Sequence, residues 1–196
     1  MLGVHPSEAK SWDDSLIDKI RECAKNKKIV AVGEIGLDYY WDKSFNDLQK
    51  EVFIKQIQLA NELNLPIDIH DREAHKDTFD IIQEYNKGSK VIMHCFSGST
   101  EFARECVKAG YYLGIGGVVT FKNAVKMKEV VKAVPLKRIL LETDAPYLTP
   151  VPFRGKENQP AYIKYVAEEI ASLREITQEE VAQVTTENAK TVFNIK

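Results

Sequence analysis

With 196 residues, 44% of them hydrophobic, the chain can bury the core of one domain, but it is short for a complete eight-stranded α/β barrel of about 250 residues. Its formal net charge of −2 excludes a globally basic surface that binds nucleic acid through charge alone, so any phosphate-binding site has to be local. The start MLGVHPSEAK lacks the pattern of a signal peptide, no apolar run reaches bilayer length, and the three cysteines show no CxxC spacing, so we expect a cytoplasmic protein without a membrane partner.

Short apolar strands alternate with amphipathic helices along the chain. Helical spacing of apolar residues occurs in stretches such as 16–24 and 102–107. The predicted strands are rich in β-branched residues and bounded by Gly, Pro or polar residues, and they lie at 28–33, 66–69, 90–93, 111–115 and 138–141. No linker or low-complexity tract interrupts this order, so we predict a single α/β domain over residues 1–196.

Helix-end signals agree with this assignment. Ser99 or Thr100 is the expected N-cap of one helix, and Gly110 is the residue expected just past its end. Thr177 and Glu180 have the spacing of a capping box. A doubly wound nucleotide-binding sheet is disfavoured because the chain has no GxGxxG or GxxxxGK motif, which leaves the barrel as the predicted arrangement.

Acidic residues and histidines stand at the carboxyl ends of the predicted strands. They are Glu34 in VGEIGLD, His70 in PIDIHDR, His94 in VIMHCFSG and Asp144 in LLETDAP. Barrel enzymes place their catalytic groups at this end of the strands, and such a set of carboxylates and imidazoles suits a divalent metal ion. A single one of these residues is more often a hydrogen-bonding residue than a ligand, so the prediction rests on the whole set.

Strand alternation places further residues near this set. Asp68 shares parity with His70, so it either orients a ligand histidine or pairs with a buried cation. Glu142 shares parity with Asp144, and it either assists a metal-bound water or satisfies a buried cation. His5 in GVHP stands at a likely strand end directly before a proline.

Seven ordered motifs resemble the TatD-type metal-dependent deoxyribonucleases of the amidohydrolase-like barrel superfamily. The motifs are GVHP at Gly3, GEIGLDYY at Gly33, PIDIHDREA at Pro66, HCFSG at His94, GGVVTFKNA at Gly116, ETDAPYL at Glu142 and PFRGKENQP at Pro152. The resemblance implies a TIM-type barrel, two divalent ions (Mg²⁺, Mn²⁺ or Zn²⁺) and hydrolysis of phosphodiester bonds in DNA, often exonucleolytic. It also implies that Glu34 is shared by both metals, that His70 and His94 hold one of them, and that Asp144 holds the other and orients the attacking water.

Cations and aromatic residues on the loops after the strands are candidates for substrate binding. Arg72, Lys122, Arg154 and Lys156 can meet phosphate oxygens, with ordinary solvated charge as the alternative. Tyr39, Tyr40 and Trp41 follow Glu34 and either stack on unpaired bases or pack the barrel rim. We also place His5 among the candidate substrate-binding residues.

The chain departs from the family pattern at its start. Family members begin with a strand ending in a His-x-His pair that supplies two ligands to the metal contacted by Asp144, and this pair is absent here. We therefore expect an incomplete barrel that lacks the first two βα units and that holds two metals or only one. In the loop at Pro152, Glu157 and Gln159 stand where the family pattern predicts Arg and Glu.

Three functions remain open from the sequence. The leading hypothesis is a deoxyribonuclease that acts on single strands or duplex ends of DNA. The same chemistry suits an esterase that releases D-amino acids from aminoacyl-tRNA. Loss of the His-x-His pair is also compatible with a non-catalytic remnant that binds nucleic acid or a partner.

Overall fold

The computed structural model describes residues 1–195, which form two compact units. The first unit contains Met1–His94 together with Val192–Asn194, and the second contains Cys95–Thr191 together with Ile195. The expectation of a single hydrolase domain stays a prediction. Among the described residues, no helix combines the length and the apolar character needed to cross a membrane.

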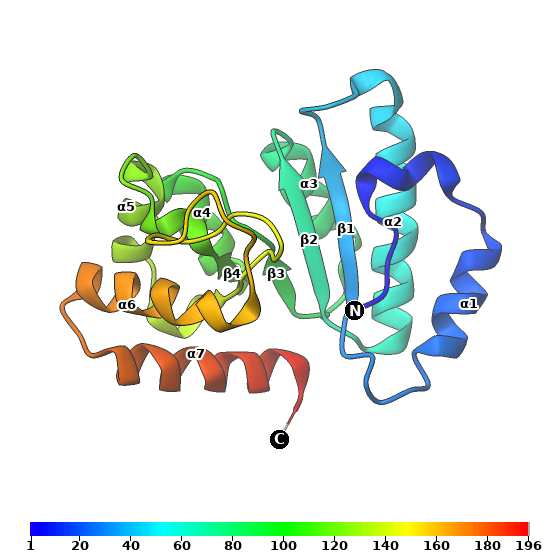
Figure 1. The fold of residues 1–196 in the computed structure, drawn as a ribbon. Helices are drawn as coiled ribbons and strands as arrows, with labels where there is room; N and C mark the ends of the chain where they lie inside the picture. The colour runs from blue at the N-terminus through cyan, green and yellow to red at the C-terminus, as the bar shows by residue number, and fades with distance from the viewer. Residues whose placement is uncertain (196) are drawn as a thin grey trace. The chain divides into compact units, whose positions relative to one another are not determined.

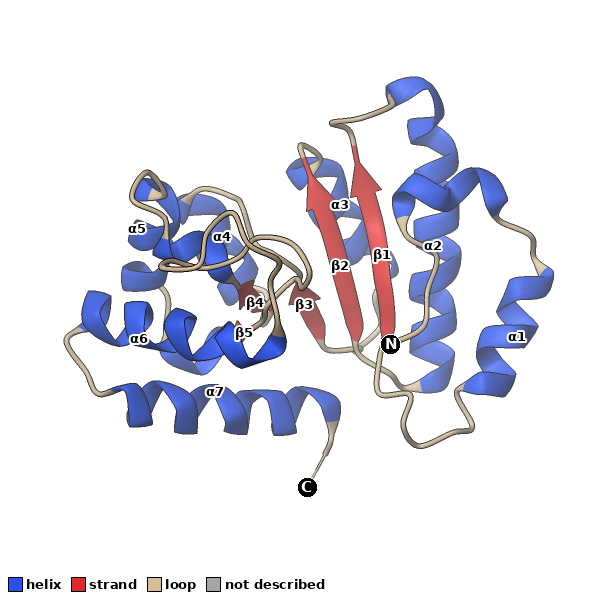
Figure 2. Ribbon diagram, in the orientation of Figure 1, coloured by secondary structure: helices blue, strands red, loops and turns tan. Residues whose placement is uncertain are grey.

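Parallel strands form the centre of the first unit (Figures 1 and 2). Strand β1 (Val32–Asp38) pairs with β2 (Ile67–Arg72), which pairs with β3 (Val91–Met93). Helix α2 (Asn46–Leu63) packs on β1 and on α3 (His75–Tyr85), while α1 (Ser15–Cys23) contacts α2. The fully buried side chains include Ile35, Leu37, Phe53, Ile57, Ile67 and Ile69.

The first two strands end later than their predicted ranges of 28–33 and 66–69, and β1 also begins later than predicted, at Val32. In β1, the buried residues Ile35 and Leu37 alternate with Glu34, Gly36 and Asp38, so the strand continues beyond Gly33 with its apolar side chains in the core. In β2, the ladder with β1 continues through His70 to Arg72. Glu34 and His70 therefore lie within strands, whereas His94 directly follows β3.

The second unit joins a short parallel strand pair to four helices. Strands β4 (Tyr112–Ile115) and β5 (Ile139–Leu141) pair in register, with Leu113 opposite Ile139. The helices are α4 (Thr100–Lys108), α5 (Val125–Ala133), α6 (Ile163–Arg174) and α7 (Gln178–Phe193). Ile115 and Ile170 are among its fully buried side chains.

The helix-end predictions in this unit are confirmed. Ser99, and not Thr100, is the N-cap of α4, and its side chain accepts a hydrogen bond from the backbone N–H of Phe102. Gly110 follows α4 with φ of 89°, a conformation that a side chain rarely adopts. The hydroxyl of Thr177 accepts the backbone N–H of Glu180 at 3.1 Å, which is the N-cap bond of the predicted capping box.

Candidate metal centre

Strands β1 and β2 bring the candidate ligands of the first unit together. Gly36 makes their close approach possible, because a Cβ atom at this position would lie 2.0 Å from the carbonyl oxygen of His70. Glu34 and Asp38 stand on one face of β1 by strand alternation, and Asp68 and His70 stand on one face of β2. The backbone thus presents three carboxylates and an imidazole within one small region.

Glu34 lies between two histidines and turns a different oxygen toward each. Its Oε2 is 4.0 Å from Nδ1 of His70, and its Oε1 is 3.6 Å from Nε2 of His94. Both distances exceed those of ordinary hydrogen bonds. A divalent ion with ligand distances of about 2.1 Å fits between atoms separated by up to about 4.2 Å, so these residues fit metal ions.

A buried carboxylate holds the far side of each imidazole ring. Oδ2 of Asp38 lies 3.0 Å from Nε2 of His70, and Oδ2 of Asp68 lies 3.2 Å from Nδ1 of His94. Both acids are almost completely buried, with side-chain exposures of 5% and 3%. A carboxylate in this place fixes a proton on the nitrogen it contacts and directs the other nitrogen toward Glu34, which is how proteins commonly orient histidine ligands of metals.

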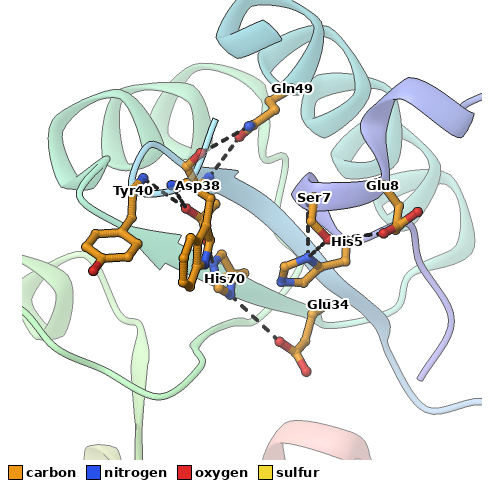
Figure 3. A network of polar contacts seen from close by, with 9 residues as sticks. His5, Ser7, Glu8, Glu34, Asp38, Tyr40, Gln49 and His70 are labelled. Carbon is orange, nitrogen blue, oxygen red and sulfur yellow. Dashed lines mark hydrogen bonds and ion pairs between the residues drawn. The ribbon is translucent and has the colours of Figure 1, made fainter. Parts of the chain in front are cut away.

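His5 adds a third ring to the cluster. Its ring centroid is 4.3 Å from that of His70, at an interplanar angle of 69°. Nδ1 of His5 accepts the backbone N–H of Ser7 at 3.2 Å, so the proton of the neutral ring belongs on Nε2 (Figure 3). Burial first, and repulsion from His70 second, lower the pKa of His5 to about 4. At neutral pH His5 is therefore an uncharged hydrogen-bond donor through Nε2.

Among residues 1–195, two side-chain groupings have the spacing of metal sites, and they share Glu34. One contains His5, Glu34 and His70, and the other contains Glu34, Asp68 and His94, with one donor atom from each residue within 4.8 Å of the others. Because the neutral ring of His5 carries its proton on Nε2, we interpret His5 as a hydrogen-bond donor to substrate and not as a metal ligand. Asp68 lies behind His94, so we interpret it as the residue that orients this histidine. Glu34, His70 and His94 are then the ligand candidates of this unit.

Two buried glutamines of α2 fix the backbone around the cluster. The side-chain amide of Gln56 accepts the N–H of Val4 at 2.7 Å and donates to the carbonyl of Val4 at 3.0 Å. Gln49 makes the same pair of bonds with Asp38, at 2.8 and 3.0 Å, and part of this network is visible in Figure 3. The helix therefore determines the position of Asp38 and of the segment that carries His5.

The remaining candidates in the first unit lie at the ends of β1 and β2. The hydroxyl of Tyr39 donates to Asp77 at 2.9 Å, and the same carboxylate pairs with Lys50, so the ring is held by α2 and α3. Burial and then the Asp77 hydrogen bond raise the pKa of Tyr39 to about 12. Arg72 places its guanidinium 4.0 Å from the ring centroid of Tyr40.

The other predicted site residues belong to the second unit. Asp144 follows β5 in a loop with φ of 55°, and its carbonyl accepts the N–H of Tyr147 at 2.8 Å. Glu142 accepts the N–H of Cys95 through Oε2 at 3.2 Å. Arg154 lies 4.1 Å from the ring centroid of Phe121, and Lys122 is exposed. A role for Asp144 beside Glu34 stays a prediction.

Comparison with known proteins shows the family of this chain. The family model described as TatD related DNase matches residues 1–194. The chain belongs to this family. It is 56% identical to an uncharacterized metal-dependent hydrolase of Bacillus subtilis, over 99% of this chain and 76% of the relative. It is 34% identical to the 3'-5' ssDNA/RNA exonuclease TatD of Escherichia fergusonii, over 98% of this chain and 76% of that protein.

Solved structures confirm the fold class of this TatD-type chain. The crystal structure of YJJV, a TatD homologue from Escherichia coli K12, matches with a TM-score of 0.93 and 32% identity, and the match covers 100% of this chain and 76% of the other. The predicted TIM-type α/β architecture and the resemblance to TatD-type metal-dependent hydrolases are thus confirmed. The predicted absence of two βα units is not confirmed and stays a prediction.

Asp38 and the two α2 glutamines are contributions that the sequence analysis missed. Asp38 has the parity of Glu34 within β1, so extending the strand beyond Gly33 finds it. Gln49 and Gln56 are seven residues apart on a helix face that also carries Val52, Phe53 and Ala60. Polar amides at this spacing on an apolar face indicate buried hydrogen bonds to neighbouring backbone.

Proposed function

We propose that this TatD-type chain is a metal-dependent nuclease that hydrolyses phosphodiester bonds in DNA, from an accessible strand end. The observation that carries the proposal is the position of Glu34 between His70 and His94, with each histidine backed by a buried carboxylate. Such carboxylate–histidine pairs orient imidazoles as metal ligands.

Glu34, His70 and His94 would hold one divalent ion, and Asp144 would be a ligand of a second ion. The ion would supply an activated water nucleophile and charge stabilisation at the reacting phosphate. Asp38 and Asp68 keep protons on the outer nitrogens of the two histidines and so keep the inner nitrogens available as ligands. We assign to Asp144 the orientation of the attacking water.

The cationic and neutral donors of the chain suit a phosphodiester substrate. His5 offers an N–H from a ring that stays neutral above pH about 4. We assign phosphate contacts to Arg72, Arg154 and Lys122 because guanidinium and ammonium groups bind phosphate oxygens through charge-assisted hydrogen bonds. The Escherichia fergusonii relative is named a 3'-5' ssDNA/RNA exonuclease, and this similarity supports a nucleic-acid substrate.

The test is cleavage of end-labelled single-stranded and duplex DNA with Mn²⁺, by the chain and by its Glu34→Gln variant. We expect Mn²⁺-dependent release of mononucleotides, reduced at least about 100-fold in Glu34→Gln because the substitution removes a ligand. Glu129→Gln on α5, where the carboxylate is exposed, is the matched control and should retain full activity.

Binding of Mn²⁺ without cleavage of any DNA would contradict the proposal. Release of D-amino acid from aminoacyl-tRNA under the same conditions would then support the deacylase alternative. Equal cleavage rates for the chain and Glu34→Gln would remove Glu34 from the chemistry.

A further inference from the structure

An exposed aromatic pair lies immediately after β1, next to the candidate metal centre. Tyr40 is 47% exposed and Trp41 is 73% exposed, and their ring centroids are 4.8 Å apart at an interplanar angle of 86°. Single exposed aromatic residues are common on protein surfaces. Tyr40 and Trp41 differ from such single residues, because their rings are adjacent and both residues contact the polar residues Arg72 and Asp38.

Arg72 covers part of both rings from the end of β2. Its guanidinium carbon lies 4.0 Å from the ring centroid of Tyr40 and 5.3 Å from that of Trp41. Within residues 1–195, Arg72 forms no ion pair with a carboxylate, so its charge is not neutralised locally. A planar cation over aromatic rings combines a stacking surface with N–H groups that bind phosphate.

Asp38 joins this aromatic pair to the candidate ligand His70. Its Oδ1 accepts the backbone N–H of Tyr40 at 2.9 Å and of Trp41 at 3.4 Å. Its Oδ2 contacts Nε2 of His70 at 3.0 Å, and Figure 3 shows Asp38, Tyr40 and His70 together in this network. The backbone of the aromatic pair is therefore held by the same buried carboxylate that orients the histidine.

We propose that Tyr40, Trp41 and Arg72 form a stacking platform for an unpaired nucleobase of the substrate strand. The inference rests on the proposed nuclease function and deepens it by naming where a base next to the reacting phosphate is held. Aromatic faces bind bases with little sequence preference, because every base has a π-face, and an arginine beside them adds a phosphate contact. A base inside a duplex has both faces covered by its neighbours, so the platform selects an unpaired end.

Binding without metal tests the platform separately from catalysis. The Trp12→Phe variant retains Trp41 as its sole tryptophan. In EDTA, a short oligothymidylate should quench the fluorescence of Trp41 in this variant in a saturable manner. Anisotropy of a labelled oligothymidylate should show about tenfold weaker binding for Trp41→Ala, and Trp41→Phe should restore most of the affinity because it retains a ring. Because Trp41 is 73% exposed, its removal leaves the core intact.

Arg72→Ala should also weaken binding and should reduce its dependence on salt, since one phosphate contact is lost. Arg104→Ala on the exposed face of α4 is the matched control for the loss of one positive charge and should bind normally. An oligonucleotide with abasic sites should bind the unmodified chain about as weakly as the normal oligonucleotide binds Trp41→Ala.

Two results would overturn the platform. One is unchanged affinity in Trp41→Ala, and the other is an equal affinity for abasic and normal strands. Either result refutes the platform even if Glu34-dependent cleavage is observed. Conversely, reduced binding by Trp41→Ala in a chain that cleaves no DNA would refute the nuclease function and leave the platform intact.

Discussion

His5 shows at the residue scale how surroundings select a protonation state. Its ring is partly buried and lies beside His70, and both conditions disfavour a positive charge. The backbone N–H of Ser7 then decides which nitrogen carries the single remaining proton. The outcome is a neutral N–H donor at pH values where an exposed histidine begins to titrate.

This lowered pKa predicts how the stability of the metal-free chain changes with pH. The unfolded chain binds a proton at His5 below pH about 6.5, whereas the folded chain binds it only below about 4, so the free energy of unfolding falls as pH decreases through this window. In EDTA, His5→Gln should lose less stability than the unmodified chain between pH 7 and 4.5, as measured by urea unfolding. Parallel losses in the two proteins would show that His5 is not the responsible group.

At the scale of a single element, helix α2 acts on the site through two glutamines. The side-chain amide of Gln49 hydrogen-bonds to the N–H and C=O of Asp38, and that of Gln56 to the N–H and C=O of Val4. These amides take the place that a neighbouring strand has in a β-sheet. Buried backbone groups left without partners are costly, so these amides determine where both segments lie. The segment at Val4 in turn carries His5.

Replacing Gln56 by leucine should therefore destabilise the chain by about 2 kcal/mol, because the N–H and C=O of Val4 lose their partner in a partly buried place. Urea unfolding measures the loss, and hydrogen exchange at the Val4 amide should become faster. Gln58→Leu is the matched control, since Gln58 is exposed on the same helix and should change stability by less than about 0.5 kcal/mol. Equal effects of the two substitutions would refute this role of Gln56.

The same elements show what the sequence allows one to predict. Apolar runs followed by a His or an acid locate Glu34, His70 and His94, because a parallel strand is buried along its length and polar only near its carboxyl end. Asp38 escaped prediction because β1 continues six residues beyond Val32, and Gly33 and Gly36 interrupt the apolar run by which a buried strand is recognised. The glutamine contacts depend on which backbone groups the folded chain leaves unpaired, which no local pattern in α2 reveals.

At the scale of the whole molecule, substitutions in the two units should have unequal effects on how much a bound metal ion stabilises the chain. Glu34, His70 and His94 all belong to the first unit, so an ion held by them should stabilise the chain by about 2.7 kcal/mol at a concentration 100 times its dissociation constant. Thermal unfolding with Mn²⁺ should show this gain in the unmodified chain and in Asp144→Asn, but not in Glu34→Gln. Asp38→Asn should retain only a reduced gain, since orienting partners contribute about 10- to 100-fold to metal affinity. Loss of the gain in Asp144→Asn to the same extent as in Glu34→Gln would place Asp144 among the primary ligands.

The two carboxylate oxygens of Asp38 contact different parts of the site, and this couples the binding of metal to the binding of nucleic acid. One oxygen serves the ring that would bind the ion, and the other serves the backbone of the rings that would bind a base. If occupancy of either side improves the geometry of this shared carboxylate, linkage requires that metal and nucleic acid raise each other's affinity by the same factor. Where divalent ions are scarce, the chains already holding a strand would then be the first to be loaded, so that the substrate recruits the cofactor needed for its own hydrolysis.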